Sequence, residues 1–501
     1  MSKHSQRRRL TLLVALVIGA AAAALAASAG GSSAARNGMA PGARNAALYH
    51  KIGSPLANAN GTVAFGCQLT NYQADGIICY GPDQMRAAYG VQPLLDRHLD
   101  GSGQTIVIID AYGSDTLAAD VANFDGVWGL PAPDLQVVAP FGIAPTDPDN
   151  AAGWSGETSL DVEWAHAIAP GAKILLVVAR SNEDSDILAA TQWVYDHNAG
   201  DVVSQSYGEA EQCMDPALLD QQHRLFRQMT RRGITLLASS GDAGAGQYTC
   251  DGSGYFKAVS TPASDPYVTG VGGTMLFADG VSGEYQGETT WNESETFGDA
   301  VAGGGGLSVV YSRPDYQAAV LDGRDLSGRN DRGGDHGHHG QQMRGVPDIS
   351  YNAGVFTGVI AVLDGSYYRF GGTSAGSPQW AALAAIADQI AGGRIGALDK
   401  ALYQVGKNGK ASSYFHDVAD GSTNGIPDLT PYLGAAYGTP IEGWDAVPGY
   451  DLATGLGTPI ASTLLPYLAA NASHGNDENG WGSVASTAGG SNGRHGSKNP
   501  H

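Results

Sequence analysis

The 501-residue chain has few charged residues, and positive charge is especially scarce. Charged side chains make up 15% of the sequence, and 49 acidic residues outnumber 28 basic ones, for a formal charge of −21. So acidic a chain has little general attraction for nucleic-acid phosphates or anionic lipid, and we expect neither as a partner. The low charge also argues against a coiled coil, whereas 72 glycines are typical of a loop-rich globular protein.

Cysteine is also scarce, because the chain has only four. None lies in a C-x-x-C pair, so metal binding through cysteine is not expected. Pairing of nearest neighbours predicts the disulfides Cys67–Cys79 and Cys213–Cys250, as suits an exported protein, although four cysteines allow three connectivities.

Only one long apolar run occurs, from Leu10 to Ala27, and it follows a basic stretch that contains Lys3 and residues 7–9. Ala27-Ser-Ala29 then offers a small-x-small cleavage site, so we predict a secretory signal peptide over residues 1–29 and a secreted product. An uncleaved membrane anchor is the alternative, since the run is about as long as a short span. After cleavage we expect no membrane contact and a monomer.

Two flanking regions lack apolar periodicity. Residues 30–74 are predicted to be a short propeptide or linker, and residues 469–501 a tail rich in Gly, Ser and Asn. Both compositions favour disorder. Residues 75–468 are predicted to form a single large domain.

Within that domain, short apolar runs alternate with helical patterns. Such repetition predicts an α/β fold, with a parallel sheet flanked by helices. In these sheets active sites gather at the carboxyl ends of the strands. We expect strands at 105–110, 173–178, 201–206 and 234–239, and helices at 157–168, 184–198, 216–232 and 375–391.

A serine lies where a glycine-rich segment enters an apolar helix. Ser374 stands in Gly371–Pro378, with the sequence GGTSAGSP. A hydroxyl at a helix start is exposed, and the helix N-terminus favours negative charge developing nearby, as a nucleophile requires. A plain N-cap serine is the alternative, but the glycines and the following proline make this pattern more specific.

Two acidic residues lie four positions apart in the segment 156–166, with the sequence GETSLDVEWAH. On a helix Glu157 and Asp161 share one face and can touch. Carboxyl groups that close share protons, and their pKa values move apart, as acid–base chemistry needs. A solvated acidic face is the alternative, but the apolar residues between them indicate a helix packed in the core.

A third acidic residue, Asp242, follows the expected strand at 234–239 in the sequence ASSGDAG. It therefore lies at the carboxyl edge of the sheet. As a neutral acid it could donate a hydrogen bond to an oxyanion, and a turn aspartate is the alternative.

Together these motifs resemble the sedolisins, the serine-carboxyl peptidases, which have a subtilisin-like fold. The resemblance extends over about residues 75 to 468, and segments 81–90, 261–273, 303–308, 313–317 and 345–349 agree with it. It implies that Ser374 is the nucleophile and Glu157 the general base, that Asp161 orients Glu157, and that Asp242 is the oxyanion donor. It also implies a secreted, acid-acting serine endopeptidase, because a carboxylate base works near pH 4 where histidine is protonated.

The resemblance further implies one structural Ca²⁺. Its pattern falls on Asp417 and Asp451 as carboxylate ligands, and on Val418, Val447 and Gly449 as carbonyl ligands. The family usually has glycine where Val447 stands. The alternative is a pair of ordinary loop aspartates.

Other functions remain as alternatives. A histidine-dependent subtilisin-like protease needs a His-Gly-Thr motif, which the chain lacks; His166 is too far along the helix from Glu157, and we interpret Asp110 as structural. An inactive homologue acting as a binding or surface protein is the second alternative.

The resemblance leaves maturation and substrate preference open. Sedolisins are normally made with a long folded prosegment, and residues 30–74 are short by comparison, so zymogen control is in doubt. Peptide substrates are expected to bind extended, against Ser204–Gly208 and Gly303–Gly306. The sequence does not distinguish endopeptidase from tripeptidyl-peptidase action.

Overall fold

The computed structural model describes residues 48–57, 63–70, 76–321, 343–407, 411–434 and 437–471. The predicted signal peptide lies outside these residues, as does the tail beyond Asn471. No helix within the described ranges is both long and apolar enough to cross a membrane.

A mostly parallel sheet runs through the centre of the domain. Its strands follow the order β14-β13-β9-β7-β4-β6-β5, with β17 also paired to β13, and only β14 runs antiparallel to its neighbour. The predicted α/β class is confirmed. The strands are β4 Thr105–Ala111, β5 Asp134–Val138, β6 Lys173–Ala179, β7 Val202–Gln205, β9 Thr235–Ser239, β13 Thr269–Ala278, β14 Tyr285–Thr290 and β17 Ile349–Asn352.

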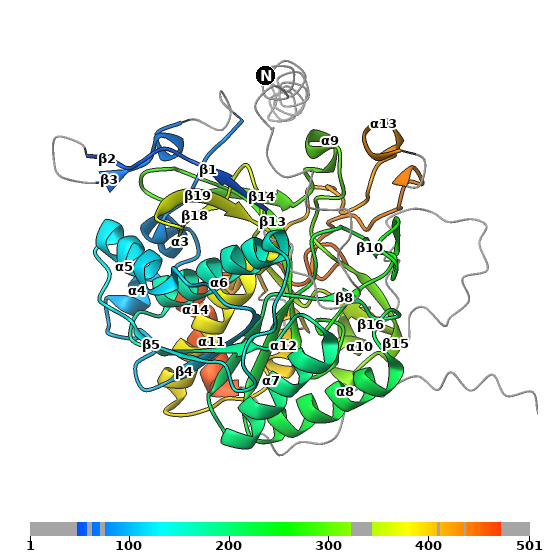
Figure 1. The fold of residues 1–501 in the computed structure, drawn as a ribbon, viewed down its shortest axis with the longest axis horizontal. Helices are drawn as coiled ribbons and strands as arrows, with labels where there is room; N and C mark the ends of the chain where they lie inside the picture. Colours follow the sequence, from blue (N-terminus) through cyan, green and yellow to red (C-terminus); the bar gives the residue numbers. More distant parts are fainter. Residues whose placement is uncertain are drawn as a thin grey trace, which may run out of the picture.

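Helices cover both faces of this sheet (Figure 1). Along β4 the side chains alternate: Ile106 and Ile108 join the core under one helical layer, and Val107 and Ile109 join the core under the other. The first layer contains α5 Leu117–Trp128, α6 Pro148–Ile168, α11 Gly376–Ala391 and α14 Ala461–Asn471, and the second contains α7 Asp184–His197 and α8 Pro216–Arg231.

The predicted helices and strands are confirmed with small shifts, except at the start of α6. That helix begins at Pro148, well before the predicted residue 157. Asp147 caps it, because its side chain accepts a hydrogen bond from the Asn150 amide at 2.9 Å. The first turns contain Gly153 and Gly156, which weaken the helical signal in the sequence.

The region before the predicted domain is not structureless where it is described, which corrects the expectation of disorder. Leu48–Lys51 form β1, antiparallel to β19 (Ser366–Gly371), and β19 also pairs with β18 (Val359–Leu363). Both predicted disulfides, Cys67–Cys79 and Cys213–Cys250, are present. The first of them ties the segment after β1 to the start of the domain.

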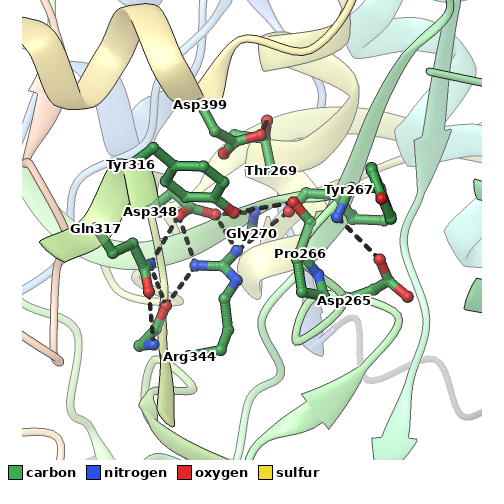
Figure 2. A network of polar contacts seen from close by, with 12 residues as sticks. Asp265, Pro266, Tyr267, Thr269, Gly270, Tyr316, Gln317, Arg344, Asp348 and Asp399 are labelled. Carbon is green, nitrogen blue, oxygen red and sulfur yellow. Dashed lines mark hydrogen bonds and ion pairs between the residues drawn. The ribbon is translucent and has the colours of Figure 1, made fainter. Parts of the chain in front are cut away.

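A buried ion pair lies where the turn between β16 (Met343–Val346) and β17 meets β13 (Figure 2). Arg344 and Asp348 are both fully buried and 2.6 Å apart. Asp348 also accepts hydrogen bonds from the Gly270 amide at 2.7 Å and from the Tyr403 hydroxyl at 2.8 Å. These bonds satisfy a charge that burial would otherwise make costly, and they fix β17 beside β13.

Candidate active site

The predicted nucleophile lies in a tight turn between β19 and α11. The chain leaves β19 through Gly372, at φ 112°, and forms a short 3₁₀ turn over Thr373–Ala375. A Cβ on Gly371 would lie 2.8 Å from the Ala353 carbonyl oxygen, so the backbone packs too closely for a side chain. The positive φ at Gly372 and the close backbone packing at Gly371 both favour glycine, and the resulting turn places Ser374 at the start of α11.

Ser374 is almost fully buried, and its hydroxyl lies 3.4 Å from the carbonyl oxygen of Ser206. Ser206 follows the carboxyl end of β7, and its own hydroxyl lies 3.5 Å from the Ser374 carbonyl oxygen. The 3₁₀ turn also contacts α6, β9, β13 and β17. The serine therefore lies at the carboxyl edge of the sheet, against the helix of predicted acidic residues.

The two predicted acidic residues of α6, Glu157 and Asp161, are fully buried. Burial raises the pKa of Asp161 well above its usual value, and the charges of Asp110 and Glu157 raise it further. Asp161 is thus grouped with Glu157 and Asp110 in the core, and α6 contacts the turn Thr373–Ala375 that carries Ser374. The predicted acidic residues therefore lie on a helix that packs against the turn of the predicted nucleophile.

Asp110 is a member of this group that the sequence analysis treated as structural. It lies near the carboxyl end of β4, fully buried. Burial raises its pKa to about 7. Its position at a strand end was visible in the sequence, but its proximity to Asp161 depends on how α6 packs on β4, which no local pattern reveals.

Asp242 contacts the serine turn from the end of β9. Its Oδ1 accepts hydrogen bonds from the Thr373 amide at 2.8 Å and from the Thr373 hydroxyl at 2.7 Å. Burial raises its pKa to about 6 even though both bonds lower it. Its buried Oδ2 makes no hydrogen bond to the described residues. The carboxyl group is thus held by one oxygen beside Ser374, with the other oxygen free to carry a proton.

His166, the histidine nearest this helix in sequence, is bound elsewhere. Its Nε2 lies 2.8 Å from the carbonyl oxygen of Pro131 and 3.4 Å from Asp125. Burial lowers its pKa. These contacts engage the ring at the far end of α6, away from Glu157.

Both predicted substrate-binding edges adjoin these residues. Ser206 of the first edge contacts Ser374, as described above. In the second edge, Gly304 donates a backbone hydrogen bond to the Gly241 carbonyl at 2.7 Å, and a Cβ on Gly304 would lie 2.1 Å from the Ser240 carbonyl oxygen. The glycine-rich segment therefore lies directly on the turn that carries Asp242.

The predicted calcium ligands also converge. The Gly449 amide donates to Asp417 Oδ2 at 2.9 Å, and the Val447 amide donates to Asp451 Oδ2 at 3.0 Å. Asp451 and Val418 are buried. Among described residues, no group of three or more His, Cys, Asp or Glu side chains is placed to hold a metal, so a site here depends on backbone carbonyls.

Comparisons with known proteins agree with this geometry. The subtilase family (peptidase S8) matches residues 143–394. Kumamolisin from Bacillus sp. is 34% identical over 376 residues, which cover 75% of this chain and 62% of that protein. Tripeptidyl-peptidase sed4 from Aspergillus fumigatus is 27% identical over 372 residues, which cover 68% of this chain and 59% of that protein. The chain thus spans about three fifths of the length of these curated relatives.

Among solved structures, Pseudomonas sedolisin, a serine-carboxyl proteinase complexed with two molecules of pseudo-iodotyrostatin, matches with a TM-score of 0.64 and 27% identity. The match covers 79% of this chain and 99% of that one. The fold and the family match define a subtilase. Within that class, the chain belongs to the sedolisin family.

Proposed function

We propose that this chain is a secreted, acid-acting serine endopeptidase that forms an acyl-enzyme on Ser374. The observation that carries the proposal is the grouping of Ser374, Asp242 and the buried acids of α6 at one sheet edge. The Pseudomonas sedolisin with the matching structure is a serine-carboxyl proteinase, which supports a serine peptidase assignment here.

In the proposed reaction, Ser374 Oγ attacks the carbonyl carbon of the scissile peptide bond, and Glu157 takes the hydroxyl proton. Asp161 orients Glu157 and shares the proton with it, and Asp110 joins the same set of buried acids. Breakdown of the tetrahedral intermediate passes the proton to the leaving amine and leaves an ester on Ser374. A water molecule, deprotonated by Glu157, then attacks the ester; the bond to Ser374 Oγ breaks, Glu157 returns the proton to Oγ, and the second product leaves as the free acid.

Asp242 has the role of oxyanion donor in this scheme. Thr373 holds Oδ1, so a proton on Oδ2 is the one directed at substrate. Only the neutral acid can donate it. Because burial raises the pKa of Asp242 to about 6, the group is neutral in acid and loses its proton above that pH. This supports a reaction that runs in acid and fails as the pH rises.

The residues at the predicted calcium site fit a hard cation. Asp417 and Asp451 offer carboxylate oxygens, and no described backbone amide donates to the carbonyls of Val418, Val447 or Gly449. Bound calcium would supply positive charge that offsets the buried Asp451 carboxylate. We propose one structural ion there.

The substrate is proposed to be a protein or peptide bound in extended form between Ser204–Gly208 and Gly303–Gly306. Endopeptidase action is the default, and release of tripeptides is the activity that the name of the Aspergillus relative indicates for that protein. Secretion through residues 1–29, and a catalytic domain over 75–468, remain part of the proposal.

The test is cleavage of an unfolded protein from pH 3 to pH 8 by the wild type, by Ser374→Ala and by Glu163→Gln. Glu163 is a matched control, because it is a buried glutamate on α6 that accepts a hydrogen bond from the Val362 amide at 2.8 Å. Activity on the acid side that is lost only in Ser374→Ala supports the proposal. No cleavage by folded wild type with calcium present contradicts it and favours an inactive binding protein.

A further inference from the structure

The strand β1 lies directly beside the chain that leads to Ser374. Leu48 is opposite Gly371, and Tyr49 is opposite Phe370, so the pairing reaches the end of β19. Gly372 and the serine turn follow at once. Any movement of β1 therefore acts on the strand that positions the predicted nucleophile.

Leu48 packs on the apolar cluster beneath that turn. This cluster contains Trp291 and Ala353, and a Cβ on Gly273 would lie within 3.3 Å of Trp291, Ala353 and the Thr373 methyl group. The Ala353 carbonyl also accepts a hydrogen bond from the Gly372 amide at 2.7 Å. Leu48 thus covers a cluster that supports the serine turn.

Tyr49 contacts α6, the helix that carries Glu157. Its ring lies 4.9 Å from the ring of Phe370 and 5.4 Å, edge-on, from that of Tyr368. A Cβ on Gly156 would be 3.1 Å from Tyr49 Cε1, so the ring lies against α6 at the residue before Glu157. Tyr49 therefore packs between β19, which leads to Ser374, and the turn of α6 that carries Glu157.

The chain that follows β1 is fastened to the domain. Cys67 is bonded to Cys79, and the ring of the buried Phe65 lies 5.8 Å from that of Trp128 and 5.1 Å, edge-on, from that of Tyr367. A cut between Cys67 and Cys79, which includes the predicted boundary at residue 75, would therefore leave β1 attached to the domain through the disulfide.

From these contacts we propose that β1 is a permanent part of the active enzyme, and that Tyr49 is a positioning residue which holds α6 and β19 at the spacing that Glu157 and Ser374 require. The inference rests on the proposed peptidase function. It moves the start of the mature domain from residue 75 to Leu48 or earlier.

The first measurement is the mass of the active, fully processed enzyme and the sequence of its N-terminus, without reductant. The inference predicts a chain that begins at or before Leu48. A fully active enzyme that begins after Lys51, with β1 lost, would overturn it.

The second measurement is kcat and KM for Tyr49→Ala, Tyr49→Phe and His50→Ala, with the number of working sites counted by active-site titration. His50 is the matched control, because it lies on the same strand with its side chain on the opposite face. Since small misplacements of reacting groups slow catalysis steeply, Tyr49→Ala should lower kcat about tenfold with KM little changed. Tyr49→Phe and His50→Ala should keep kcat within about twofold of wild type.

A double-mutant cycle separates positioning from general destabilisation. In the wild type, Gly156→Ala pushes a methyl group against the Tyr49 ring and should lower kcat, whereas in Tyr49→Ala the space is open and Gly156→Ala should cost nothing more. Independent effects of the two changes, or an unchanged kcat in Tyr49→Ala, would overturn the inference. An inactive wild type would instead contradict the peptidase function itself.

Discussion

Replacement of Thr373 by valine should extend the activity of the enzyme toward neutral pH. The Thr373 hydroxyl donates to Asp242 Oδ1 at 2.7 Å, and this bond lowers the pKa of Asp242. Valine keeps the shape of the side chain and the backbone amide but removes the hydroxyl. The ionised form of Asp242 then loses stabilisation, so its pKa rises.

The size of the shift follows from the bond. A hydrogen bond to a charged group contributes about 1.5–3 kcal/mol, and about 1.4 kcal/mol corresponds to one pKa unit. The lower end gives a rise of about one unit from the wild-type value of about 6. Because the neutral acid is the active form, the alkaline limb of the profile should move up by the same amount.

The assay is kcat/KM for a fluorogenic peptide from pH 3 to pH 8. Thr373→Ser is the matched control, since it keeps the hydroxyl and should leave the limb in place. A limb in Thr373→Val that stays at the wild-type pH, or moves to lower pH, would refute the role of Asp242 as a neutral donor.

Three further predictions concern stability. Arg344→Met leaves the Asp348 carboxylate buried without its cation and should lower the free energy of unfolding in urea by about 3–5 kcal/mol. Arg180→Met removes a partly exposed ion pair with Asp186 and should lower it by less than about 1 kcal/mol. Equal losses in the two variants would contradict this prediction. Asp399 is a fully buried carboxyl group that accepts a hydrogen bond from the Thr269 hydroxyl at 3.2 Å. Burial raises the pKa values of Asp110, Asp242 and Asp399 to about 7, 6 and 8, so their stabilising effect is present below about pH 4 and is lost as the pH rises through those values. Thermal scans of Ser374→Ala should show Tm falling from pH 4 to pH 8, and a rising Tm would refute the sign. Calcium at about 100 times its Kd should raise the free energy of unfolding of the wild type by about 2.7 kcal/mol. Asp451→Asn should abolish that gain. A wild type whose unfolding is the same with calcium and with a chelator would contradict the proposed calcium site.

The sheet and its main helices could be predicted because their sequences are periodic and their ends are marked. The strand at β4 is a run of buried aliphatic residues, and α8 begins at Pro216 and ends at Arg231, close to the predicted bounds. The start of α6 could not be predicted, because two glycines weaken its first turns while tertiary packing holds them in the helix.

The central site residues could be predicted because each stands in a short motif. Asp110 was assigned a structural role, because its importance depends on the approach of α6 to β4 rather than on a motif. β1 was missed for a similar reason. Its sequence, LYHK, is too short to show a period, and the strand exists because β19 offers an edge with which it can pair.

The most direct test of the account is the rate of acylation in a single turnover at pH 4, followed by rapid quenching and peptide mass mapping of wild type, Glu157→Gln and Glu163→Gln. The account predicts that the acyl group is found on Ser374, that Glu157→Gln slows its formation by a factor of about 10² to 10⁴, and that Glu163→Gln leaves it within about twofold of wild type. An acyl group on another residue, or acylation of Ser374 at an undiminished rate in Glu157→Gln, would contradict the proposed Ser374–Glu157 mechanism.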